Sequence, residues 1–274
     1  MSAGLRLTVV PIELPDILVE QLPSGGEAEW AELGVTVPAV GGEVSIGVFD
    51  GLQIAPGMGG IGGLSLLGSA SVLPFDVFDT DGFDESDIAF GIGARVNLLE
   101  ESFYVPGVSL SLMRRSLSEV RFGDICPSGI ITGGSSGDTL ESGTCAGSGD
   151  AGEFTFDLTN WSTRLVASKR FLGAGATLGL GRDGYDSTVG FGFRAPPPAG
   201  SGPAVAFRVR DIDVGSSRWT VFGNLSFTFL IASIAAEAGW VQGDSPIGEF
   251  SDFQSNFDPG DGSWYGGVGA RISL

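Results

Sequence analysis

The sequence predicts an all-β fold, a transmembrane antiparallel up-and-down β-barrel, and three observations support this prediction. Apolar residues alternate with polar or small residues in many segments from about residue 60 to the C-terminus, as in strands whose two faces meet different surroundings. Several segments are about ten residues long or longer, whereas globular strands centre on about five or six and membrane-crossing strands need about nine to eleven. Short and long connections also take turns along the chain, which is typical of membrane barrels.

The individual strands follow from this alternation. In residues 88–98, for example, the even positions are apolar and the odd positions are Ala, Gly, Arg and Asn. Counting such segments gives about ten strands, within a range of about 8 to 12. They are residues 30–37, 43–53, 62–74, 87–99, 105–120, 153–169, 173–195, 204–228, 231–243 and 263–274. Turns at Asp183–Gly184 and Gly215–Ser216 would divide the two longest segments and give about twelve strands. Undivided, the two segments would project beyond the bilayer as a hairpin.

The chain divides into an N-terminal segment, residues 1–26, and a barrel, residues 27–274. The N-terminal segment contains Pro11, Pro15 and Pro23 and is expected to be a tail, a plug or an edge strand. Long external loops are expected at residues 75–87, 123–152, 195–203 and 243–262. Two of these loops, the first and the last, are rich in aspartate and glutamate.

Composition excludes several functions. The 274 residues include 46 glycines, no histidine and a formal net charge of −19. Without histidine, Ser-His-Asp, Cys-His and His-ligated zinc chemistry cannot operate, and we expect no enzyme activity. A strongly acidic chain without a basic stripe is not expected to bind nucleic acid. The glycines are expected on the inner wall of a narrow barrel, where they leave room for bulky or charged neighbours.

The two cysteines indicate the compartment. Cys126 and Cys145 lie in a segment rich in Gly, Ser and Thr. One disulfide closing this loop would imply an oxidising compartment, while the alternative is two unrelated free thiols. Two thiolates alone make a poor zinc site.

The last strand carries the clearest resemblance to a known class. Its alternate positions are Trp264, Val268, Ala270, Ile272 and Leu274. With the rest of residues 27–274, this pattern resembles bacterial outer-membrane β-barrel proteins of the porin-like class, in which the final residue is usually aromatic. The resemblance implies an outer-membrane location, contact with its lipid, and recognition of the last strand by the barrel-assembly machinery. It implies no oligomeric state. Residues 1–10 lack the features of a signal peptide, so the chain is either a mature form or not exported.

Polar residues on the inward faces are the candidate site. They are Arg95, Asn97, Arg115, Arg164, Asn224, Glu237 and Arg271. Buried charges need partners, and Glu237 is expected to pair with Arg271 because their strands should be neighbours. The set would form either a structural polar core or a charge-lined pore. In a pore, the arginines would attract anionic solutes, whereas the acidic loops would favour cations at the mouth.

Two further sets of residues suggest contacts with lipid and with ions. Four tryptophans near strand ends suit an aromatic girdle, with core packing as the alternative: Trp161, Trp219, Trp240 and Trp264. Carboxylates that suit calcium alternate in one loop: Asp79, Asp81, Asp84 and Glu85. Because the EF-hand order is not met, this loop is either a loose calcium site or a solvated acidic loop. No other cofactor is expected.

Three functions remain open from the sequence. The leading hypothesis is a small passive channel or transporter for small solutes, or a structural membrane barrel. The second is a cell-surface adhesion or lattice protein that binds through its acidic external loops. The third is a soluble, secreted all-β binding domain, although the apolar strand faces would then lie in water.

Overall fold

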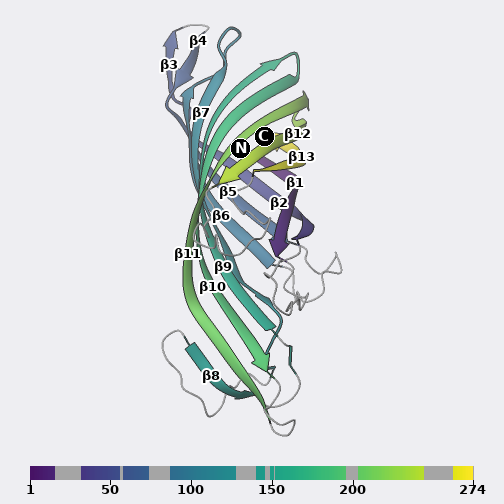
Figure 1. Ribbon diagram of the computed structural model, residues 1–274. Helices are drawn as coiled ribbons and strands as arrows, with labels where there is room; N and C mark the ends of the chain where they lie inside the picture. The colour runs from purple at the N-terminus through teal and green to yellow at the C-terminus, as the bar shows by residue number, and fades with distance from the viewer. Residues whose placement is uncertain are drawn as a thin grey trace.

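Ten strands close into an antiparallel barrel in the computed structural model. The structure describes residues 1–15, 32–55, 58–73, 87–127, 140–145, 149–150, 152–195, 203–243 and 262–273. The barrel strands are β1 (Ser2–Pro15), β2 (Glu32–Phe49), β5 (Gly63–Leu73), β6 (Asp87–Leu99), β7 (Gly107–Phe122), β9 (Gly152–Phe171), β10 (Ala174–Ala195), β11 (Ala204–Phe229), β12 (Ala232–Gly243) and β13 (Ser263–Ser273). Each pairs with the next in this order, and β13 pairs with β1 (Figure 1). The predicted all-β barrel is therefore confirmed.

The N-terminal segment differs from the prediction. Ser2–Pro15 is neither a tail, a plug nor an edge strand, because β1 pairs with β2 on one side and β13 on the other. The β13 ladder ends at Val9, so Pro11 and Pro15 lie where β1 has a partner on one side only, a position that proline tolerates. In addition, the predicted strands 30–37 and 43–53 are one strand, β2. The count of ten is correct because these two differences cancel.

Short connections lie at one end of the barrel. Leu172 and Gly173 form a two-residue turn between β9 and β10, with φ of 50° and 87°. Both angles are positive, as a tight hairpin turn requires. At the same end, β3 (Leu52–Ala55) and β4 (Met58–Ile61) form a small separate hairpin between β2 and β5 (Figure 1). In the described part of the chain, no helix is long and apolar enough to cross a membrane.

Three strands extend far beyond the others at the opposite end. β9, β10 and β11 have 20, 22 and 26 residues. β10 and β11 run without a break through the two candidate turns, so the twelve-strand alternative is wrong. β12 pairs with β11 only as far as Arg218, and nearer the tip of β11 the strand β8 (Leu140–Cys145) takes the place of β12 (Figure 1). We call residues 152–158, 187–195 and 204–214, together with β8, the extension.

The strands that flank the predicted loops at residues 75–87, 195–203 and 243–262 end at this end of the barrel, and most residues of these loops are outside the described ranges. The fourth predicted loop, at residues 123–152, contains β8.

The two faces of the barrel wall differ in polarity. On β10, the outward residues Leu178 and Leu180 are 72% and 53% exposed, whereas the inward residues Gly179, Gly181 and Asp183 are buried. Other exposed apolar residues on the outer wall are Leu5, Leu7, Ile92, Leu225, Phe227, Ile234 and Val268. A wall that is apolar outside and polar or small inside is the pattern of membrane barrels.

Candidate functional site

The lumen is built from one inward residue in every two along each strand. Strand register brings several of these residues into one row around the barrel. The row contains Thr228, Ser233, Arg271, Gly4, Glu43, Ser69, Gly91, Arg115, Asn160 and Tyr185. Along this row, Arg271 and Arg115 come from distant parts of the chain and lie on either side of the one carboxylate in the row, Glu43.

The first of two ion pairs on the inner wall joins Arg6 and Glu237. Arg6 Nη2 donates to Glu237 Oε1 over 2.5 Å, and Tyr265 also hydrogen-bonds to Glu237. The expected pairing of Glu237 with Arg271 is therefore wrong. The partner, Arg6, enters from β1, which the sequence pattern did not identify as a barrel strand.

Asp183 forms the second polar cluster. Its Oδ2 accepts from Arg164 Nη2 at 2.7 Å and from the hydroxyl of Thr220 at 3.2 Å. The Asp183 side chain is only 5% exposed. Low exposure makes the loss of either partner costly, since a buried carboxylate needs its hydrogen bonds.

Three inward arginines have no such partner. Within the described residues, Arg95, Arg115 and Arg271 form no ion pair. Arg95 lies close enough to Arg271 and Glu43 to interact with both electrostatically. Arg115 interacts with Glu43 and with Asp183, whose carboxylate is already paired with Arg164. Among the described residues, the three arginines thus outnumber the carboxylates that act on them, Glu43 and the already paired Asp183. Arg95 and Arg115 are half-buried and Arg271 is exposed, so solvent reaches all three.

Glycines on the inner wall make room for these side chains. A Cβ at Gly91 would lie 2.9 Å from Arg115 Cγ and would collide with the Ser69 hydroxyl. At Gly181 it would collide with the guanidinium of Arg164. Because real Cβ contacts are longer, bulkier residues at these positions would displace the arginines. The glycines thus occupy the role predicted from their number.

The other predicted lumen residues lie on the inner wall as well. Asn97 is half-buried and close to Gly63. Asn224 is half-buried and opposite Glu237 in the register. Sequence reasoning missed Arg6, Glu43 and Asp183. Arg6 and Glu43 could have been found by extending the period-two pattern across β1 and β2, whereas Asp183 was assigned to a possible turn.

The predicted girdle tryptophans lie towards the end of the barrel that carries the long loops. Trp161, Trp219 and Trp264 are exposed on the outer wall, and Trp240 packs edge-on against Trp264 with ring centroids 5.3 Å apart. Two outward arginines lie over these rings: Arg114 over Trp161 at 5.6 Å and Arg182 over Trp219 at 5.5 Å.

The acidic loop with Asp79, Asp81, Asp84 and Glu85 lies outside the described residues. In the described ranges, no group of three His, Cys, Asp or Glu residues could hold a metal ion.

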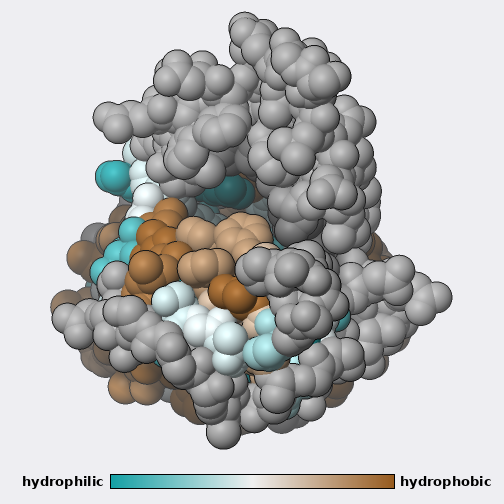
Figure 2. All heavy atoms as spheres, turned by 60° about the horizontal axis from the view of Figure 1, so that its bottom comes forward, coloured by the Kyte–Doolittle hydropathy of each residue, from teal (hydrophilic) through white to brown (hydrophobic). Residues whose placement is uncertain are grey.

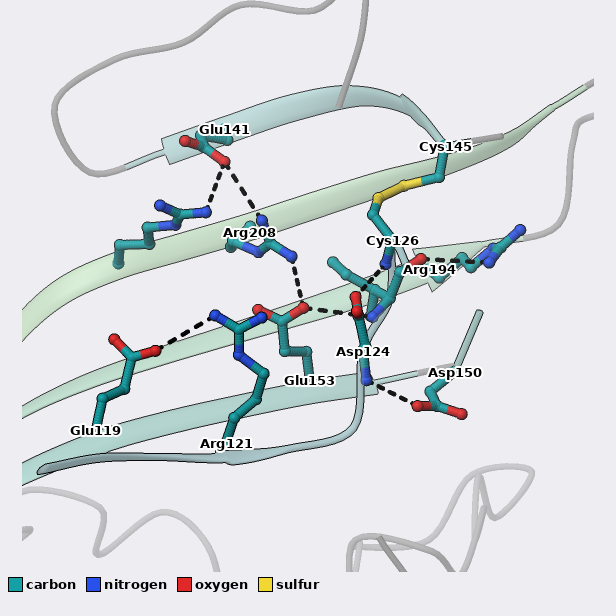
Figure 3. Close-up of polar contacts among 12 residues, drawn as sticks. Glu119, Arg121, Asp124, Cys126, Glu141, Cys145, Asp150, Glu153, Arg194 and Arg208 are labelled. Atoms are coloured by element: carbon teal, nitrogen blue, oxygen red, sulfur yellow. Dashed lines mark hydrogen bonds and ion pairs between the residues drawn. A yellow bond between two sulfur atoms is a disulfide. The ribbon is translucent and has the colours of Figure 1, made fainter. Parts of the chain in front are cut away.

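The disulfide predicted from the cysteines is present. Cys126 and Cys145 are bonded, with Cα atoms 5.5 Å apart, and they form a buried cluster with Ile125 and Ala206 on the outer face of the extension. Beside this cluster, Arg208 forms an ion pair with Glu153 at 2.5 Å (Figure 3). The disulfide, together with a hydrogen bond that Ile125 N donates to Glu153 Oε2 at 3.3 Å, thus fastens the segment before residue 128 to the extension.

Comparison with known proteins finds similar folds but no family. No protein-family model matches the chain, and no curated protein sequence matches it. The solved structure of the outer-membrane protease OmpT from Escherichia coli matches with 10% identity and a TM-score of 0.44, over 100% of this chain and 93% of that chain.

Two other solved structures match more distantly. A mutant of the TodX monoaromatic hydrocarbon channel has 11% identity and a TM-score of 0.33, over 100% and 90%. A Pseudomonas aeruginosa FadL homologue has 9% identity and a TM-score of 0.24, over 99% and 90%. The strand pairing makes the chain a closed ten-stranded barrel. Its matches are outer-membrane proteins at low identity, and no family is assigned.

Proposed function

We propose that this chain is a barrel of the bacterial outer membrane whose lumen passes small anionic solutes passively. The membrane location is supported by the outer wall, where large apolar side chains such as Leu178, Leu225 and Ile92 are more than 70% exposed. A soluble domain would leave this continuous apolar surface in water, which monomeric soluble proteins avoid. Barrel strands of 11 to 26 residues are also long enough to span a bilayer.

One observation carries the preference for anions: among the described residues, Arg95, Arg115 and Arg271 form no ion pair, and solvent reaches them. The carboxylates that act on Arg95 and Arg115 are Glu43 and Asp183, and Asp183 is already paired with Arg164. A narrow channel with low-dielectric walls strengthens the field of uncompensated charges. The net charge of the whole chain is −19, so a preference for anions would have to come from these local arginines.

Planar-bilayer recordings test the proposal. In a potassium chloride gradient, the wild-type protein should conduct ions. Its reversal potential should lie closer to the equilibrium potential of chloride than to that of potassium. Replacing the three arginines (Arg95→Gln, Arg115→Gln and Arg271→Gln) should shift the reversal potential toward the equilibrium potential of potassium. The matched control is Arg121→Gln, because Arg121 lies on the outer face of β7 and pairs with Glu119. No conductance, or the same selectivity in the triple variant, would contradict the proposal.

The role proposed is passive and not catalytic. The chain has no histidine to act as a general base. Hydrolysis of peptides or lipids by the purified, folded barrel would contradict this part of the proposal.

Surface adhesion is the second candidate, and the extension favours it. A sheet that projects past the barrel and is closed by the Cys126–Cys145 disulfide offers a fixed binding surface. Deleting residues 123–151 should abolish attachment to a partner and leave a heat-modifiable barrel. Attachment that survives this deletion would argue against adhesion through this loop.

A further inference from the structure

The two faces of the extension have different surroundings. Its outer face is covered by the segment Gly123–Pro127, which buries Ile125 and the Glu153–Arg208 ion pair. Its other face carries exposed apolar side chains. These are Leu140, Phe154, Phe191, Phe193 and Phe207, with exposures from 36% to 60%. Lipid does not explain this exposure, because this region of β11 lies beyond the end of β12.

Strand register shows that these apolar side chains belong to the lumen side of the wall. The β9–β10 ladder has no register shift from Ala174 to Phe193, so Phe191 and Phe193 point to the same face as the inward residue Asp183. On β11, one extra residue at Asp211, with φ of 59°, shifts the alternation. The bulge turns Phe207 inward, opposite Phe193, where an unbroken strand would have pointed it outward.

A second bulge also places apolar side chains on the lumen side of the wall. On β7, the register shifts between Leu117 and Val120, and both side chains are at most 8% exposed. The shift keeps both on the inner face, although they are three residues apart. Two bulges on different strands therefore gather apolar side chains on the lumen side of the wall.

This apolar surface is continuous with the arginines of the lumen. Successive register rows lead from Phe193 through Phe191 and Val189 to Leu158, which lies two residues from Asn160, the neighbour of Arg115. At about 3.3 Å per residue, the eight residues from Phe193 to Tyr185 span about 26 Å. Figure 2, which brings this end of the molecule forward, shows hydrophobic surface within a hollow.

We propose that this path binds a single-chain amphiphilic anion, with its apolar chain along the aromatic inner face and its anionic end at Arg115. This inference rests on the proposed function, because it names a class of solute for the same lumen. An inorganic anion would gain nothing from about 26 Å of apolar wall, and a neutral hydrocarbon would gain nothing from unpaired arginines. An amphiphile with one carboxylate or sulfate group uses both features, because aromatic surface binds the chain and guanidinium binds the oxyanion.

Binding to the barrel in lipid nanodiscs tests the proposal, with empty nanodiscs as the blank. Calorimetric titration with dodecanoate should show saturable binding. Butanoate, which lacks the chain, and dodecyltrimethylammonium, which has the opposite charge, should each bind at least about ten-fold more weakly. Dodecyl sulfate should bind like dodecanoate if charge and not the carboxylate is recognised. Equal binding of the cationic amphiphile would overturn the proposal.

Matched variants separate the two ends of the site. Phe156→Ser should weaken dodecanoate binding about ten-fold, because Phe156 lies on the inner face only two inward rows from Asn160, within reach of a twelve-carbon chain whose carboxylate is at Arg115. Phe103→Ser should not weaken it, because Phe103 is exposed in a turn at the other end of the barrel. Arg115→Gln should weaken dodecanoate binding and leave dodecanol binding unchanged, with Arg121→Gln as its control. Gel-shift assays would check that each variant is folded. Dodecanoate affinity that is unchanged by Phe156→Ser and by Arg115→Gln would overturn the assignment.

The binding and conductance results can fail separately. Dodecanoate binding without conductance would contradict the channel and retain the site. Anion-selective conductance without dodecanoate binding would contradict the site and retain the channel.

Discussion

Replacing Asp183 by alanine should destabilise the barrel by about 2–4 kcal/mol. The carboxylate accepts one hydrogen bond from the charged Arg164 at 2.7 Å and one from Thr220 at 3.2 Å. A hydrogen bond to a charged group contributes about 1.5–3 kcal/mol and a neutral one about 0.5–1.5 kcal/mol. The Arg164 side chain is 25% exposed, so the remaining water recovers only part of the loss. Urea unfolding in lipid vesicles would give the free-energy difference.

A double-mutant cycle separates the loss of the Arg164–Asp183 interaction from any wider disruption of the fold by the substitutions. Arg164→Ala should add little destabilisation in the Asp183→Ala background, because the shared interaction is already lost. Asp186→Ala is the matched control, since Asp186 lies on the same strand with its side chain exposed. The reasoning fails if Asp183→Ala is as stable as the Asp186 variant, or if the two lumen substitutions are additive.

Three other changes give distinct results. Replacing Cys126 and Cys145 by serine removes a crosslink across 19 residues, worth about 3 kcal/mol in the chain-entropy model, so protease should cut the extension faster while the barrel keeps its gel shift. Gly91→Val should displace Arg115 and reduce anion selectivity in bilayer recordings without abolishing folding. Leu178→Arg puts a charge on the outer wall and should lower the free energy of unfolding in vesicles by up to about 2–4 kcal/mol, whereas a water-exposed site would show almost no change.

The alternation of apolar and polar residues within single segments was enough to predict most strands of the barrel wall. Residues 88–98 and 219–229 show their two faces in the sequence, and they form β6 and the end of β11. β1 has the same signal, with Leu5 and Leu7 outward and Arg6 inward. The nearby prolines hid it, and its long-range pairing with β13 has no local signature.

Two features could not be predicted in the same way: which charged residues pair across the lumen, and which face of a strand points inward. Arg6 and Glu237 are 231 residues apart, so their contact depends on how the register accumulates around the whole barrel. Asp211 inserts one residue into β11, and nothing in the local sequence marks that position as a bulge. A one-residue shift reverses the facing of every later side chain, which is why the inward aromatic face was not foreseen.

The pairing of β1 with β13 has a consequence for how the protein is made. β1 finds one of its two partners only in β13, at the far end of the described residues. The cylinder therefore cannot close before β13 has been made, and one edge of β1 stays unpaired until then. Contacts between chain ends make folding slow, and unpaired edges invite aggregation in the meantime. This topology therefore leaves one edge of β1 open to other strands until β13 pairs with it.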